Sequence, residues 1–340
     1  MTRSLLIKLL LLSIAASMLA WFPVAQAVLW ALLDGAFGGR GGTHLFATLR
    51  QTAMIGALAL AVLVALRAGC YNLGGEGQMV IGALTAALVG LHLPGPPLLV
   101  TLTALAAAML AGAAWASLAA WLFTGCGVPV LIASLLLNYP ARSLCSWLVN
   151  GPLRDQDSGL AQTMRLEREL WWPALPGTDM NLMVPLVLGL ALLVHVGLTR
   201  TRAGYRSALL GHSAEFVRFS GMSPARLTLG SMAVSGAIAG LAGALAVFDL
   251  HYRYVDDMLT APLYAWSGIA AVLLVASRPA WVLPAALLLA AIKTSAFGLE
   301  RKLGLPREAA DVLQALIVLA VAGGVWRSNA AQQRDPKGQP

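Results

Sequence analysis

The polar residues best placed to act on a solute lie in one glycine-rich stretch, Arg67–Gln78, which reads RAGCYNLGGEGQ. Asn72 and Gln78 offer amide groups and Glu76 offers a carboxylate, with a long apolar run on either side. At membrane depth, polar groups and irregular backbone are tolerated only where they face protein or a water-filled path. The stretch therefore predicts a solute pathway at a broken or re-entrant segment near residues 67–78.

Two interpretations of these polar residues are open. In the first, Asn72, Glu76 and Gln78 line a gate or pathway, or hold the broken helix together through backbone hydrogen bonds. In the second, the stretch lies at the cytoplasmic interface, where Glu76 is solvated or paired with Arg67. We favour the first, because an acid at membrane depth needs a partner or a cavity.

A second polar feature interrupts a later apolar run at Asn138-Tyr139-Pro140. Proline inside a helix frees a backbone carbonyl and kinks the chain. Asn138 can then either contact solute or form hydrogen bonds between helices. We place Asn138 and Tyr139 in the candidate solute pathway.

The basic loop 200–226 predicts a short amphipathic helix. Ser213 is a good N-cap and Gly221 a good terminator, while Phe216 and Phe219 share one helical face. Such a helix either docks on a cytoplasmic partner or rests on lipid headgroups. The candidate partner-contacting residues of this loop are Tyr205, Arg206, Gly211, Glu215, Phe216, Arg218, Phe219 and Gly221.

Catalytic and metal-binding patterns do not occur in the sequence. It has no GxxxxGK[ST] and no HExxH motif, and its histidines and cysteines lack metal-ligand spacing. We therefore predict no catalytic residue, no metal site and no cofactor on this chain. Cys70, Cys126 and Cys145 are interpreted as small apolar residues, and Asp256-Asp257 as a solvated outer loop.

Composition sets the fold class. The chain has 340 residues, of which 59% are hydrophobic and 11% charged, and its mean hydropathy is +0.76. Soluble domains carry about 25% charged residues, so this is a polytopic, all-α helical membrane bundle in a single transmembrane domain, 1–340. The net charge of +8 falls in short loops, which indicates topology rather than nucleic-acid binding.

We predict about ten transmembrane helices. They cover residues 5–33, 45–66, 78–93, 98–122, 129–149, 182–199, 228–248, 261–277, 280–297 and 311–326. In the first, Val24–Ala27 resembles a signal-peptide cleavage site, but the apolar run continues to Leu33. We favour a retained first span over cleavage. In the seventh, Gly236 and Gly240 lie on one face and allow close helix packing.

Loop charges predict the orientation. Loop 200–226 carries five arginines against one acid, Glu215: Arg200, Arg202, Arg206, Arg218 and Arg226. Loop 150–181 is richer in acids and lies one span away. The positive-inside rule then places loop 200–226 and both termini in the cytoplasm and loop 150–181 outside. Loop 298–310 is an exception, because it is slightly basic yet falls outside.

Together these stretches resemble the membrane subunits of bacterial ABC importers, in the branch of simple-sugar, branched-chain amino-acid and nucleoside permeases. Arg67–Gln78 is similar to the branch's RAGLFNIGAEGQ signature, with Cys70-Tyr71 and Gly75 as departures. Leu131–Pro152 and Gly204–Gly243 resemble its "STLMLNYIA…GPL" and coupling stretches. Tyr264–Leu274 is a weaker match that has lost an acid near Ser267. The form of Asn72–Gln78 is closest to nucleoside-type permeases.

The resemblance implies partners and a mechanism. A second homologous permease would complete the pathway, giving a heterodimer in the bacterial cytoplasmic membrane. A cytoplasmic ABC ATPase would hold ATP and Mg²⁺ and contact the loop helix near residues 211–221, and an extracytoplasmic binding protein would deliver solute. Nucleosides are the first choice of solute, and a simple sugar or another small polar solute is the alternative.

Two other classes compete with this one. An ion-coupled secondary transporter normally needs buried acids or histidines in several spans. Glu76 is the one acid that fits, since Asp249 and Asp311 lie near span ends. An intramembrane enzyme needs a nucleophile–base pair or a metal site, and the sequence offers neither. The permease is therefore the preferred class.

Overall fold

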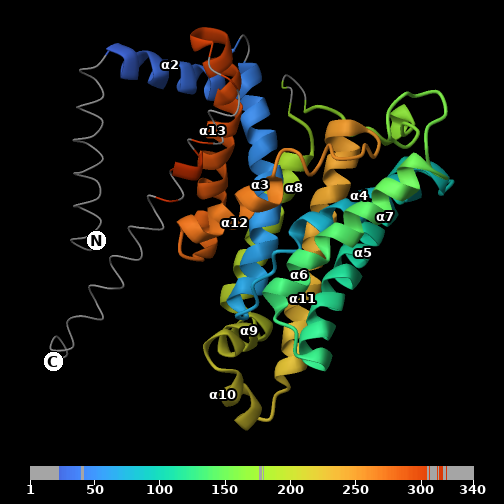
Figure 1. The fold of residues 1–340 in the computed structure, drawn as a ribbon, viewed down its shortest axis with the longest axis vertical. Coiled ribbons are helices and arrows are strands. Elements are labelled where there is room, and N and C mark those ends of the chain that lie inside the picture. The colour runs from blue at the N-terminus through green and yellow to red at the C-terminus, as the bar shows by residue number, and fades with distance from the viewer. Residues whose placement is uncertain are drawn as a thin grey trace. The chain divides into compact units, whose positions relative to one another are not determined.

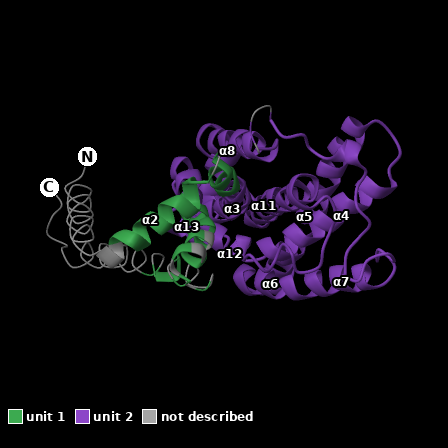
Figure 2. Cartoon of the chain, turned by 90° about the horizontal axis from the view of Figure 1, so that it is seen from above, with its two compact units in different colours: residues 1–49, 288–340 green, residues 50–287 purple. Residues whose placement is uncertain are grey.

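The structure, a computed structural model, describes residues 23–39, 42–175, 178, 180–304 and a few residues between 306 and 319. Over that part of the chain the elements are helices, and the extended pairing found there is one antiparallel bridge between Gln162 and Val255. The chain divides into two compact units (Figure 2). Unit 1 comprises residues 1–49 and 288–340, and unit 2 comprises residues 50–287.

Three helices of unit 2 pack closely against one another: α4 (Gly75–His92), α5 (Pro97–Cys126) and α11 (Pro224–Ala246) (Figure 1). Of the most apolar part of α11 and its continuation, 83% is buried, against 22% for α5. Helix α11 is therefore surrounded by protein, while α5 presents most of its apolar side chains outward. That outward apolar surface is what a lipid-facing helix requires.

Close backbone contacts join these three helices. A methyl group on Gly112 of α5 would lie 2.9 Å from Cα of Gly240, and one on Gly236 would lie 2.9 Å from the carbonyl carbon of Gly112. Gly243 approaches Met79 of α4 in the same way. The predicted close approach at Gly236 and Gly240 is confirmed. Small residues allow it because membrane helices associate through van der Waals packing.

Unit 2 contains further helices, of which α3 (Thr43–Arg67) is long and 72% buried over its most apolar part. They are α3 from Arg50 onward, α6 (Val130–Leu136), α7 (Asn138–Asn150), α8 (Met183–Arg200), α9 (Arg202–His212), α10 (Ala214–Phe219), α12 (Tyr264–Leu274) and the start of α13 (Val282–Leu303). Two 3₁₀ turns, Arg168–Leu170 and Pro279–Trp281, and a π-helical turn, Val247–His251, complete it.

Unit 1 contains α2 (Pro23–Phe37), the first turns of α3 and the later part of α13. Asp34 of α2 pairs with Lys302 of α13 at 2.8 Å. A methyl group on Gly35 would lie 2.9 Å from the backbone nitrogen of Gly298. Thr48 Oγ1 donates to the Ala36 carbonyl at 2.6 Å, so a second glycine contact and a few polar bonds hold this unit together.

Five helices in the described part of the chain are long and apolar enough to cross a bilayer. They are Thr43–Arg67, Pro97–Cys126, Met183–Arg200, Pro224–His251 and Pro279–Glu300. Crossing a hydrocarbon core of about 30 Å takes about 20 helical residues. The fold is thus an all-α, multi-pass membrane bundle. The predicted spans 5–33 and 311–326 and both termini lie largely outside the described residues, and the count of about ten crossings stays a prediction.

Candidate functional site

The glycine-rich stretch forms a short non-helical connection between α3 and α4. Helix α3 ends at Arg67, the chain turns at Gly69 with φ +74°, and α4 begins at Gly75. A left-handed turn of this kind favours glycine because no Cβ obstructs it. The break falls at residues 68–74, so Glu76 and Gln78 lie inside the first turn of α4. The helix begins three residues before the predicted span start at 78.

Asn72 and Gln78 form a buried pair of amides. Asn72 Nδ2 donates to Gln78 Oε1 and Gln78 Nε2 donates to Asn72 Oδ1, both at 3.0 Å. Asn72 Nδ2 also donates to Ser235 Oγ of α11 at 2.8 Å, and Gly74 N donates to Asn72 Oδ1 at 2.9 Å. We call Asn72, Gln78 and Ser235 the amide network. Its polar atoms are satisfied inside the protein, so it fixes the start of α4 against α11.

Asn138 binds the same connection from the other side. Its Oδ1 accepts from Gly77 N at 2.8 Å, and its Nδ2 donates to the Leu73 carbonyl at 2.9 Å. The predicted kink at Pro140 is a break between α6 and α7 at Leu137, whose carbonyl also accepts from Trp115 Nε1 at 3.2 Å. The break turns Asn138 toward the first turn of α4.

A cavity of about 430 Å³ opens beside this junction. It is lined by Glu76, Leu135, Asn138, Tyr139, Arg142, Asp257, Thr260, Ala261, Leu263 and Trp266. Three predicted pathway residues, Glu76, Asn138 and Tyr139, therefore meet at one cavity. Asn72 and Gln78 are absent from its lining. All of the lining belongs to unit 2.

The cavity wall carries an ionic chain of two acids and one base. Arg142 Nη1 lies 3.4 Å from Glu76 Oε1, and Arg142 Nη2 lies 3.0 Å from Asp257 Oδ1. The Glu76 side chain is 11% exposed, while those of Arg142 and Asp257 are 43% and 69% exposed. Glu76 pairs with Arg142 rather than with Arg67. We call Glu76, Arg142 and Asp257 the ionic chain.

Sequence reasoning missed part of this cavity. Arg142 lies four residues after Asn138 and thus on the same helical face, a signal that was available. Asp256-Asp257 was interpreted as a solvated loop, and the Asp257 side chain is 69% exposed, but the partners of the two acids were not predicted: Asp257 bonds to Arg142, and Asp256 Oδ2 accepts from Ser146 Oγ at 2.6 Å. Those pairings join residues more than 100 positions apart, which only the fold brings together.

A second acid is buried elsewhere in unit 2. Asp249 lies in the π-helical turn after α11 and is 1% exposed. The positive charge of Arg50 acts on its carboxylate, and Asn181 Nδ2 donates to its backbone carbonyl at 3.2 Å. From the sequence we expected Asp249 only to lie near the end of a span, and its burial was not predicted. It does not line the cavity beside Glu76.

The basic loop forms two helices rather than one. Thr201 caps α9 by accepting from Gly204 N at 3.1 Å, and Ser213 caps α10 by accepting from Phe216 N at 3.1 Å. Gly221, with φ +76°, follows α10. The predicted boundaries at Ser213 and Gly221 are confirmed. Helix α9 carries Tyr205, Arg206 and Gly211 and was not predicted.

Helix α10 has one buried side and one exposed side. Val217 is fully buried, whereas Phe216 is 55% and Phe219 is 84% exposed. Glu215 and Arg218 are also exposed. In Figure 1, α9 and α10 lie at one end of unit 2, and the segment between α7 and α8 lies at the other. Two exposed phenylalanines at a helix tip form a compact apolar surface suited to contact with another molecule.

The segment 151–175, at the other end of unit 2, is held by ring stacking. Trp171 stacks on Tyr252 with ring centroids 4.3 Å apart, and the Arg165 guanidinium lies 4.2 Å from the Trp171 centroid. Backbone bonds from Thr163 and Leu166 to residues 252–254 reinforce it. The segment is therefore a structured surface rather than a loose connection.

Comparison with known proteins identifies the class of this chain. Residues 44–322 match the family model described as the permease component of the branched-chain amino acid transport system. The chain belongs to this permease family. It is the permease subunit of an ABC importer, a multi-pass membrane protein whose transport depends on an ATPase partner. Members of the family are transport components rather than enzymes.

Relatives of this permease include one glucose permease and two nucleoside permeases. This permease is 29% identical to the glucose ABC transporter permease protein TsgB13 of Haloferax volcanii, covering 76% of this chain and 71% of that one. It is 28% identical to the guanosine ABC transporter permease protein NupP of Bacillus subtilis, covering 86% and 84%. It is 26% identical to the nucleoside ABC transporter permease protein NupB of Lactococcus lactis, covering 78% and 75%.

Proposed function

We propose that this permease carries nucleosides, through a pathway that passes the cavity beside Glu76. The observation that carries the proposal is the lining of that cavity, which combines the ionic chain with the aromatic rings of Tyr139 and Trp266. Two of the named relatives, a guanosine and a nucleoside permease, support the same solute class.

The cavity offers each kind of contact that a nucleoside uses. Carboxylates accept hydrogen bonds from ribose hydroxyls, and a guanidinium donates to carbonyl and ring nitrogen atoms of a base. Tyr139 and Trp266 are 66% and 45% exposed and offer ring faces for base stacking. A volume of about 430 Å³ suits a small molecule of this size.

The charge of the cavity favours neutral solutes over anionic ones. Two carboxylates against one guanidinium leave the ionic chain with a net negative charge. A phosphate group would face Glu76 and Asp257, and like charges at short range repel in a medium of reduced dielectric constant. The permease should therefore discriminate against nucleotides while accepting the parent nucleosides.

The candidate residues divide into two roles. Glu76, Asn138 and Tyr139 contact solute, together with Arg142, Asp257 and Trp266. Asn72 and Gln78 hold the start of α4 in place, so their effect on solute is indirect. Asn138 has both roles, because its amide bonds to Leu73 and Gly77 while the side chain also lines the cavity.

Helices α9 and α10 contact the ATPase. The exposed Phe216 and Phe219 form the apolar part of this surface, and Glu215 and Arg218 its charged part. ATP and Mg²⁺ are held by that partner, and this chain performs no catalysis. Nucleotide binding and hydrolysis then bias the alternating access of the cavity through rigid displacement of packed helices.

The proposed orientation of unit 2 in the membrane sets where the binding protein and the second permease lie. Arginines concentrate in 200–226, which supports a cytoplasmic position for α9 and α10, with both termini on that side. The segment 151–175 then lies outside, where an extracytoplasmic binding protein delivers solute. A second, homologous permease completes a heterodimer in the cytoplasmic membrane.

A simple sugar is the second candidate solute, supported by the glucose permease of Haloferax volcanii. The ionic chain can bind sugar hydroxyls as well as those of ribose. The two solutes differ in the base, so they also differ in how much they depend on stacking against Tyr139 and Trp266.

The test is uptake of labelled guanosine and labelled glucose into proteoliposomes. One preparation contains the chain alone, and the other contains it with its partner permease, the ATPase and the binding protein. The full assembly is also prepared with Glu76→Gln, and with Asp157→Asn as a control acid that is exposed and outside the cavity.

The expected result is saturable, ATP-dependent guanosine uptake by the full assembly, reduced by Glu76→Gln and unchanged by Asp157→Asn. Excess unlabelled guanosine should compete, and guanosine monophosphate should not. Glucose uptake without guanosine uptake would show that the solute is a sugar rather than a nucleoside, while the protein would still be an ABC importer permease. Uptake by the chain alone under an ion gradient would overturn the proposed mechanism, and Asp249→Asn would then be the next variant.

A further inference from the structure

Two glycines bring α9 into direct backbone contact with the turn after α3. A Cβ on Gly69 would lie 3.2 Å from Cα of Gly211, and a Cβ on Gly211 would lie 2.5 Å from the Arg67 carbonyl oxygen. Real Cβ atoms almost never approach another atom that closely, so a side chain on Gly211 forces the two backbones apart. This contact joins the loop 200–226 to the start of the glycine-rich stretch.

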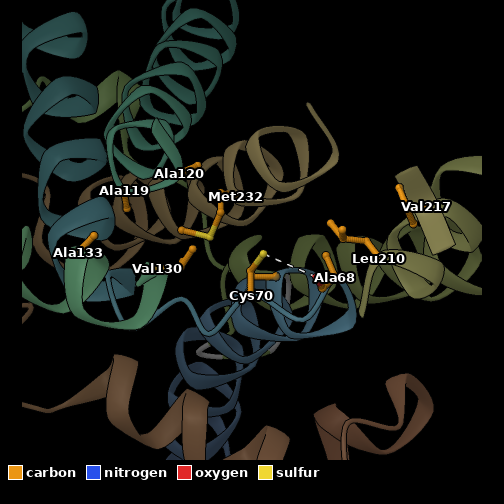
Figure 3. Packing of buried hydrophobic residues seen from close by; sticks show 10 residues of the cluster. Ala68, Cys70, Ala119, Ala120, Val130, Ala133, Leu210, Val217 and Met232 are labelled. Atoms are coloured by element: carbon orange, nitrogen blue, oxygen red, sulfur yellow. Dashed lines mark hydrogen bonds between the residues drawn. The ribbon is translucent and has the colours of Figure 1, made fainter. Parts of the chain in front are cut away.

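Residues that flank the two glycines belong to one buried apolar cluster (Figure 3). Its members are Ala65, Ala68, Cys70, Ala119, Ala120, Val130, Ala133, Leu210, Val217 and Met232. In Figure 3, Cys70 faces Met232 of α11, and Leu210 of α9 lies beside Ala68. Protein interiors are packed as densely as organic crystals, so a displacement of α9 and α10 is passed on rather than absorbed.

The chain leads directly from this cluster to the solute cavity. Cys70 is two residues from Asn72 of the amide network, and Leu73 is held by Ser134 Oγ at 3.0 Å and by Asn138 Nδ2 at 2.9 Å. Glu76 follows in the first turn of α4. Residues 69–76 therefore connect the contact between the glycines to the ionic chain with hydrogen bonds along most of their length.

We propose that Gly69 and Gly211 are positioning residues that transmit movement of α9 and α10 to the cavity wall. The segment 70–74 connects the glycine contact to the cavity wall, and the amide network keeps this segment rigid. This inference rests on the proposed function in one respect, namely that α9 and α10 contact the ATPase. It adds the route by which that contact reaches Glu76 and Asn138.

Alanine substitutions test the contact, because matched glycines exist elsewhere in unit 2. Gly127 ends α5 with φ +73°, close to the +74° of Gly69, yet an added Cβ there meets nothing within 4 Å. Gly230 is helical like Gly211 and also meets nothing within 4 Å. Gly69→Ala against Gly127→Ala, and Gly211→Ala against Gly230→Ala, therefore isolate the contact from backbone strain.

The readout is the number of guanosine molecules transported per ATP hydrolysed by the full assembly in proteoliposomes. We expect Gly69→Ala and Gly211→Ala to lower this ratio about tenfold, within the usual range of coupling between sites. ATP hydrolysis and the guanosine KM should stay near the parent values. Gly127→Ala and Gly230→Ala should match the parent ratio.

Gly69→Ala and Gly211→Ala could fold poorly because each adds a Cβ in a crowded place. A variant that removes atoms instead of adding them therefore provides a second test. Val217→Ala removes buried atoms between α10 and the cluster, and Val187→Ala in α8 is its control, since Val217 is 0% and Val187 is 1% exposed. Val217→Ala should lower the ratio more than Val187→Ala. Equal ratios in the parent, the glycine variants and Val217→Ala would overturn this inference alone. Absence of ATP-driven uptake by the parent would overturn the proposed function, and this inference with it.

Discussion

The first turn of α4 has one side that contacts buried amides and another side whose carboxylate lines the cavity. On one side Asn72 and Gln78 are 2% and 1% exposed and bond to each other, and Asn72 also donates to Ser235. On the other side Glu76 bonds to Arg142, whose side chain is 43% exposed, and Arg142 bonds to the still more exposed Asp257. Two residues of the same turn, Glu76 and Gln78, thus belong to different chemical environments.

This difference follows from the cost of burying charge. Neutral amides can be buried when each donor and acceptor has a partner, as in the amide network. A carboxylate and a guanidinium lose much of their hydration on burial, and their attraction does not fully compensate. In the ionic chain Arg142 and Asp257 accordingly stay exposed, and the more buried Glu76 is paired with Arg142. The amide network stabilises the turn, and in the function that we propose the ionic chain exchanges partners with a solute.

Removing the amide network should have the largest effect on stability. Asn72→Ala leaves Gln78, Ser235 and the Gly74 N–H short of partners in a buried site, and each orphaned group costs about 1–3 kcal/mol. We expect a loss of about 3 kcal/mol or more, seen as a lower unfolding temperature of the purified permease. Asn150→Ala, which removes an exposed amide bonded within its own helix, is the control. Equal stability of the two variants would contradict the structural role of the network.

Removing the cation of the ionic chain should mainly affect transport. Arg142→Ala leaves Glu76 and Asp257 facing each other without compensation. We expect kcat/KM for guanosine uptake to fall at least about tenfold, which corresponds to about 1.4 kcal/mol. The unfolding temperature should change much less than in Asn72→Ala.

Arg154→Ala, at an exposed arginine outside this cavity, is the control for the charge lost. A large drop in unfolding temperature with normal uptake would reverse the roles assigned to the two sides of α4.

A change at the tip of α10 should affect ATPase binding without affecting the amide network or the ionic chain. Phe219 is 84% exposed, so Phe219→Ser should leave the unfolding temperature unchanged. Binding of the ATPase should weaken about tenfold, as for an aromatic residue central to an interface. Co-purification and titration of the ATPase measure this, and Phe219→Leu, which keeps most of the apolar area, should lose less. Normal ATPase binding by Phe219→Ser would exclude this surface as the contact.

The aromatic part of the cavity should give the smallest effect. Tyr139→Ala removes a ring face and should raise the guanosine KM about three- to tenfold, matching about 0.5–1.5 kcal/mol for an aromatic pair. Tyr139→Phe keeps the ring and should stay within about twofold of the parent. Competition by adenosine, guanosine and glucose in the same assay shows whether the loss follows the base. An equal loss for glucose would favour the sugar alternative.

Local signals were the easiest to predict from the sequence. The glycine-rich interruption at 67–78, the break near Pro140, the N-cap at Ser213 and the close packing at Gly236 and Gly240 depend on neighbouring residues and on helical spacing. Arg142 as the partner of Glu76 could not be predicted in the same way, because 66 positions separate them and Arg67 was nearer in sequence. Helix α9 was missed because its residues read as a polar, basic loop.

The sequence by itself determined the membrane class, the helical bundle and the short list of polar residues at the break. Hydrophobic runs, loop charges and glycine spacing are local properties, so they survive without knowledge of the fold. The tertiary structure alone decided that Asn72 and Gln78 face inward, that Glu76 meets Arg142 and Asp257, and that Gly211 touches Gly69. Each of these depends on which helix faces which, and that is set by the packing of α4 and α11 with the helices around them.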